Sequence, residues 1–80
     1  MYYRTPKAIG HAIRNRRQEL SMTQSDLARK MGVSRQWLVA VEQGKPGAEL
    51  GLILRGFNVL RMSVRLVPYD VDDEGEPGLD

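Results

Sequence analysis

The chain has 80 residues, which is enough for one small domain and too few for most enzyme architectures. Hydrophobic residues make up 41% of it and cysteine is absent, so we expect a globular body without disulfides or thiolate metal sites. A reducing cytoplasm is the default location, and no apolar run approaches the roughly 20 residues that span a bilayer.

The formal net charge of +2 conceals a division along the chain. Through Leu66, 12 basic side chains stand against four acidic ones, a net charge of +8. The residues after Leu66 carry six acidic side chains and no basic one, a net charge of −6. A basic body with an acidic tail indicates a polyanion-binding domain followed by an appendage that would repel the same polyanion. The alternative is that the charges of both parts serve only to keep the protein soluble.

The first predicted helix begins at Thr5 and Pro6, because threonine can cap free backbone amides and proline suits the first helical position. Its apolar stripe contains Ile9, Ala12, Ile13, Arg16 and Leu20, where Arg16 contributes the aliphatic stem of its side chain. The opposite, polar face holds Lys7, Arg14 and Arg17.

Two short helices follow. Thr23 begins the first of them, with Asp26 completing a capping box, and Gly32 ends it. Ser34 caps the next helix, which we expect over about residues 35–43. The inward-facing residues of the pair are Leu27, Ala28, Met31, Leu38 and Val41, with Val33 buried in the turn between them.

A fourth helix is expected over about residues 48–60. Its predicted inner face contains Leu50, Ile53, Leu54, Phe57 and Leu60. Gly51 and Gly56 weaken this helix by about 1 kcal/mol each relative to alanine, but small residues let another backbone approach. We therefore expect tight packing at both glycines.

The pattern then changes to a period of two residues, which is typical of a β-strand over residues 62–67. Met62, Val64 and Leu66 share one face of this strand. Residues 70–80 are acidic and offer few apolar side chains to bury, so they should be disordered when free. The chain is thus divided into a domain over residues 1–67 and an acidic tail over residues 68–80.

The strongest functional signal is the pair of short helices joined by a turn at Gly32. The run LSMTQSDLARKMGVSRQWL from Leu20 to Leu38, followed by VEQG from Val41 to Gly44, resembles the phage-repressor-like (XRE, Cro/C1) helix-turn-helix family. The resemblance covers about two thirds of the chain. It implies an all-α, compact four- to five-helix lambda-repressor-like domain that binds double-stranded DNA.

By this resemblance the third helix lies in the major groove, with Arg35, Gln36 and Ala40 facing the bases and Ser34 at the tip. The chemistry agrees, because Arg can pair with guanine, Gln with adenine, and a methyl group can contact thymine. An ordinary solvated helix face is the alternative for Arg35 and Gln36. The expected DNA backbone contacts are Thr23, Gln24, Lys45 and Trp37, the last of which alternatively covers the turn.

The helix that runs almost directly into a strand, from Phe57 to Val67, resembles HipB-type antitoxins. This implies a homodimer held by pairing of the strand with its copy, a palindromic operator, and a HipA-like serine/threonine kinase toxin as partner. A strand folded back on its own domain and a free extended linker are the structural alternatives.

Two other functions stay open on the sequence. One is a stand-alone phage-type or restriction–modification controller regulator, and the other is a protein-interaction module without DNA binding. We expect no enzyme, cofactor or metal site, because no nucleophile–base set, carboxylate pair or metal-ligand cluster occurs. The one histidine, His11, has no partner at ligand spacing, and we expect it at the surface.

Overall fold

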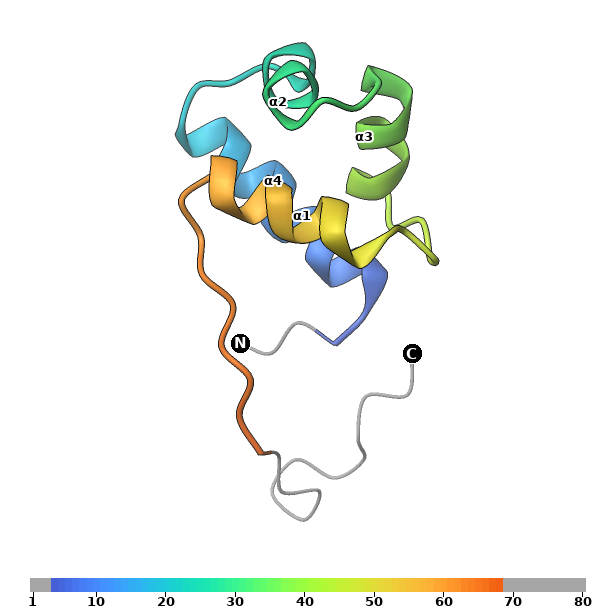
Figure 1. Cartoon of the computed structure of the whole chain (residues 1–80), viewed down its shortest axis with the longest axis vertical. Coiled ribbons are helices and arrows are strands. Elements are labelled where there is room, and N and C mark those ends of the chain that lie inside the picture. Colours follow the sequence, from blue (N-terminus) through green and yellow to red (C-terminus); the bar gives the residue numbers. More distant parts are fainter. Residues whose placement is uncertain (1–3, 69–80) are drawn as a thin grey trace.

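The computed structural model describes residues 4–68, and the acidic segment expected to be disordered lies outside the described residues. The elements are four α-helices, namely α1 (Pro6–Glu19), α2 (Gln24–Met31), α3 (Arg35–Glu42) and α4 (Leu50–Val59). Helix α3 contacts both α1 and α2, and α2 also contacts α4 (Figure 1). The all-α fold and the four helices predicted from the sequence are confirmed.

Each of the three predicted N-caps is formed. The Thr5 hydroxyl accepts a hydrogen bond from the Ala8 amide at 2.9 Å. At α2 the Thr23 hydroxyl accepts from the Asp26 amide, and the Asp26 carboxylate accepts from the Thr23 amide, both at 3.0 Å. The Ser34 hydroxyl accepts from the Trp37 amide at 3.0 Å. These caps fix where α1, α2 and α3 begin because they satisfy amides that have no partner within the helix.

The core lies where the inner faces of all four helices meet. Its largest fully buried side chains are Ile13, Leu27, Met31, Leu38 and Leu60. Gly56 is buried against Met31, whose side chain would lie 3.1 Å from a Cβ added at the glycine. The predicted tight packing at Gly56 is therefore confirmed, whereas the same prediction for Gly51 is wrong because no atom would lie within 4 Å there.

Several burial predictions are also wrong. Leu50 and Leu54, expected on the inner face of α4, are 67% and 41% exposed, because α4 meets the bundle mainly through its second half. Leu20 ends α1 as its C-cap and is exposed, and Val33 is only half-buried. Arg17, expected on the polar face of α1, lies in the core.

The strand predicted at residues 62–67 is not formed in the single chain, and no strand occurs anywhere in residues 4–68. Met62 still packs against the core, and the chain beyond it continues from the end of α4 as an extended segment (Figure 1). Val64 is 50% and Leu66 is 91% exposed. A strand needs a neighbour for its backbone hydrogen bonds, and residues 4–68 provide none, so the alternative of a strand folded back on its own domain is not observed.

None of the helices in the described part of the chain is long and apolar enough to cross a membrane.

Candidate nucleic-acid interface

The turn between α2 and α3 sets the direction of the third helix. Gly32 ends α2 in the left-handed conformation with a φ of 75°, which a glycine adopts without steric cost. The Val33 amide then donates to the Ala28 carbonyl at 3.0 Å, and the small Ala28 side chain is buried beneath. This geometry lets α3 start three residues after the glycine, at Arg35, with its first turn exposed.

Helix α3 divides sharply into a buried and an exposed face. Leu38 and Val41 are buried at 0% and 3% exposure. Arg35 and Gln36 are exposed on the first turn, next to the exposed cap Ser34, while Ala40 is half-buried one turn further on. The structure thus presents the polar pair that the sequence predicted as base-reading residues on an accessible helix end.

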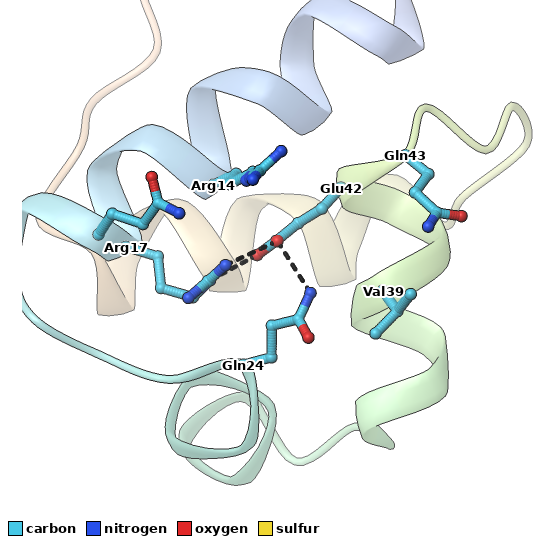
Figure 2. A pocket seen from close by; sticks show the side chains of 7 residues that line it. Arg14, Arg17, Gln24, Val39, Glu42 and Gln43 are labelled. Atoms are coloured by element: carbon cyan, nitrogen blue, oxygen red, sulfur yellow. Dashed lines mark hydrogen bonds and ion pairs between the residues drawn. The ribbon is translucent and has the colours of Figure 1, made fainter.

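Arg35 is connected to the core by a continuous series of side-chain contacts. Its Nη2 donates to Gln24 Oε1 at 3.3 Å, and Gln24 Nε2 donates in turn to Glu42 Oε1 at 3.1 Å. Glu42 also accepts from Arg17, at 2.7 Å from Nε and 3.0 Å from Nη2. Figure 2 shows Gln24 and Arg17 meeting the same carboxylate from α2 and α1.

These contacts border a polar cleft of about 360 Å³ between α1, α2 and α3. The residues that line it are Arg14, Arg17, Gln18, Gln24, Val39, Glu42 and Gln43. The Arg17–Glu42 ion pair is buried, whereas Arg14 and Gln43 are exposed (Figure 2). Gln18, which also lines the cleft, is exposed as well. The cleft therefore has a neutralised floor, and among its exposed lining residues Arg14 is the charged one.

Sequence reasoning missed Arg17 and Glu42. Arg17 follows Ile9 and Ile13 at intervals of four residues, and Glu42 follows Leu38 at the same interval, so both charges continue apolar stripes. A basic and an acidic residue on two stripes of the same core must pair, since an isolated buried charge is very costly. That signal was present in the sequence.

The predicted DNA backbone contacts occupy different environments. Lys45 is exposed in the loop after α3, where its amide donates to the Ala40 carbonyl at 3.0 Å. The Thr23 side chain caps α2. Trp37 is half-buried and packs against the core, as expected if it covers the turn. His11 is exposed on α1, as predicted.

One ionisable group at this surface has a shifted pKa. The backbone and side-chain hydrogen bonds with Thr23 lower the pKa of Asp26, and Arg29 at 3.1 Å lowers it further. No group of three or more His, Cys, Asp or Glu residues could hold a metal ion in residues 4–68.

The helix-turn-helix arrangement identifies the class of protein. Residues 8–68 match the family model of a helix-turn-helix domain, and the chain belongs to this family. It is 34% identical over 64 residues to an HTH-type transcriptional regulator of Sinorhizobium fredii, covering 80% of this chain and 84% of that protein. A second such regulator, from Methanocaldococcus jannaschii, is 37% identical over 54 residues, covering 68% of this chain and 82% of that protein. The chain is thus an HTH-type transcriptional regulator.

Solved structures share the fold. HipB in a HipA–HipB–operator complex superposes with a TM-score of 0.78 at 23% identity, covering 88% of this chain and 99% of that one. The biofilm regulator SinR bound to DNA has a TM-score of 0.64 at 28% identity, covering 69% of this chain and 89% of that one. The predicted resemblance to the phage-repressor-like helix-turn-helix family is confirmed. The predicted similarity to HipB is confirmed for the fold.

Proposed function

We propose that the chain is a sequence-specific repressor that places the first turn of α3 in the major groove of operator DNA. The observation that carries this proposal is the exposure of Arg35 and Gln36 on a helix whose opposite face is anchored in the core. Arg35 would pair with guanine and Gln36 with adenine, while Ser34 and the Ala40 methyl group complete the reading surface. As a regulator of transcription it would act in the cytoplasm.

Contacts to the phosphates would hold this helix in the groove. Lys45 is an exposed cation in the loop directly after α3. At the amino-terminal end of α2 the Thr23 amide is already bonded to Asp26, so the Thr23 hydroxyl hydrogen and the Gln24 backbone amide would be the donors to a phosphate. The exposed part of Trp37 would face the sugar–phosphate wall. Such contacts carry affinity but little sequence information.

The test is binding to a pool of randomised duplex DNA, which needs no known operator. Replacing Arg35 with alanine should remove the preference at one base pair, with a loss of about 1–3 kcal/mol at the preferred sequence. Lys45→Ala should weaken binding to all sequences alike and reduce the salt slope by about one. An Arg35 variant with an unaltered base preference would show that α3 does not read DNA as proposed.

We further propose that two copies form a homodimer by pairing the segments that contain Met62, Val64 and Leu66. Val64 and Leu66 expose apolar surface beside α4, and together with Leu50 and Leu54 they line a groove of about 390 Å³. Apolar surface of this kind is normally covered by a partner. A two-fold dimer would present two reading helices about 34 Å apart on a palindromic operator.

The finer role we propose is that of an antitoxin that represses its own operon and neutralises a HipA-like serine/threonine kinase. The support is the match to HipB over 88% of the chain, against 69% for the match to SinR. The match to SinR supports a stand-alone regulator as the second candidate. A pull-down from native cells with mass spectrometry distinguishes the two, because only the antitoxin should retain a kinase.

A further inference from the structure

A side chain of α1 is bonded to the backbone at the end of α4. Arg16 lies in the last turn of α1, and its Nε donates to the Leu60 carbonyl at 3.0 Å, across 44 positions of sequence. Leu60 is the C-cap of α4, and the last carbonyls of a helix lack partners within it and carry the negative end of the helix dipole. Arg16 therefore supplies, from another helix, the kind of donor that the end of α4 needs.

The chain leaves α4 through a residue in the left-handed conformation. Arg61 has a φ of 57°, which a residue with a side chain adopts only at a steric cost. The Met62 amide donates back to the Phe57 carbonyl at 2.8 Å, and the Met62 side chain packs against the core. The two peptide groups that flank Arg61 are thus each held by one hydrogen bond, the first from α1 and the second from α4. We call residues 60–62 the exit turn.

The exit turn fixes the direction in which the proposed dimer segment leaves the domain. Val64 and Leu66 follow Met62 by two and four residues, and they are exposed. Rotation of either held peptide group would swing both side chains relative to the helices. The place at which a second copy would pair is therefore determined at the exit turn.

The same helix is also packed tightly against α3. Helix α1 contacts α3, and at Gly10 a Cβ would collide with the Val41 carbonyl near the end of α3. Since backbone meets backbone there, α1 cannot shift along α3 without a clash. Helix α1 consequently connects the proposed reading helix, through Gly10, with the exit turn, through Arg16.

In a two-fold dimer, the orientation of each exit turn would set the distance and the angle between the two copies of α3. On DNA, one added base pair between two half-sites moves them apart by about 3.4 Å and turns one relative to the other by roughly 35°. A dimer with rigid exit turns matches one separation of the half-sites. At any other separation at least one exit turn has to rotate, and its hydrogen bond from Arg16 is lost.

We propose that Arg16 is a positioning residue for the dimer, and that it sets how strictly the protein selects the separation between two half-sites. This rests on the proposed function, because it requires a dimer through residues 62–67 on a palindromic operator. Arg16 needs to touch neither a base nor the second copy. It acts through the Leu60 carbonyl alone.

The experiment measures binding as a function of the separation between half-sites. The half-site is first obtained by selecting randomised duplex DNA with the wild type, and duplexes are then made in which two inverted half-sites move apart one base pair at a time. The wild type should prefer one separation. Arg16→Met keeps the length of the stem but has no donor, so its preference for that separation over the neighbouring ones should fall about 2- to 12-fold, the contribution of one ordinary hydrogen bond.

Arg16→Gln is the matched control. Its Nε2 is attached to Cδ, as Nε of arginine is, so it still donates at the same place, while it lacks the positive charge and the ion pair with Glu19 just as methionine does. It should keep the wild-type preference for one separation. Both variants should keep the base preference within a half-site and the dimer mass in light scattering, because neither alters α3 or the pairing segment.

The outcomes separate this inference from the proposed function. If Arg16→Met keeps the wild-type preference for one separation, the positioning role is wrong and the dimer stands. Equal losses in the methionine and glutamine variants would also overturn it, because charge and not the hydrogen bond to Leu60 would then be responsible. If the wild type is a monomer, or binds all separations equally, the proposed dimer fails and the positioning role fails with it.

Discussion

At the scale of single residues, Arg17 and Glu42 stand apart because they place opposite charges inside a small apolar core. The pair is satisfied by two direct hydrogen bonds, by Gln24 on one side and by the Met22 carbonyl on the other. In residues 4–68 no buried side-chain polar atom of a residue that is not exposed lacks a hydrogen-bond partner. Such a pair contributes little net stability while intact, but it is costly to break from one side.

Arg17→Ala should therefore lower the free energy of unfolding by about 3–5 kcal/mol, because Glu42 would be left buried without its counter-charge. Arg14→Ala is the matched control, since Arg14 is an exposed arginine on the same helix, and its effect should stay within about 0.5 kcal/mol. Urea denaturation followed by circular dichroism measures both. Equal midpoints for the two variants would mean that the ion pair does not matter for stability.

Among the helices, the crossing of α1 and α3 depends on Gly10. This glycine is buried, and a Cβ at that position would collide with the backbone carbonyls of Val41 and Glu42 at the end of α3. Backbone atoms cannot rotate away as a flexible side chain can. The close approach of the two helices therefore requires a residue without a side chain, and it brings α3 near enough to α1 for Glu42 to reach Arg17.

Gly10→Ala should be destabilising by about 1–3 kcal/mol, the usual cost of forcing an extra methyl group into a packed site. Gly51→Ala tests the same substitution on α4 where no atom lies nearby, and it should stabilise the protein by about 0.5–1 kcal/mol through helix propensity. Thermal unfolding of both variants provides the measurement. A stable Gly10 variant would show that the two helices can move apart at little cost.

For the molecule as a whole, the segment after α4 is the part on which the proposed dimer depends. Its apolar side chains are exposed in the single chain, which agrees with the proposal that this segment forms a strand only when it pairs with its copy in a dimer. In such a dimer the two domains would each present a net charge of +8 to the same DNA duplex, which favours binding to a polyanion.

Placing proline at Val64 should abolish the dimer, because proline removes a backbone donor and does not fit between paired strands. Light scattering should then report half the mass of the wild type. Proline at Arg35, the first residue of α3, is the control, since proline is tolerated in the first turn of a helix and this residue lies outside the groove proposed for the dimer. A Val64 variant that keeps the mass of a dimer would refute pairing through this segment.

Whether a structural feature could be predicted from the sequence depended on how far apart along the chain its determining residues lie. The caps at Thr5, Thr23 and Ser34 and the helix end at Gly32 were predicted correctly, because a cap or a left-handed turn is determined by residues within one helical turn. The exposed face of α3 followed from the spacing of its apolar residues in the same way. The sequence by itself therefore determined the helices, their order and the helix-turn-helix.

Only the tertiary structure decided which helices touch at which residues. The approach at Gly10, the geometry of the Arg17–Glu42 ion pair, and the exposure of Leu50 and Leu54 all depend on how helices cross. The periodic pattern of one helix states which face is apolar, but not what that face will meet. The orientation of Gln24 between a donor and an acceptor from two other helices arises only after those crossings are set.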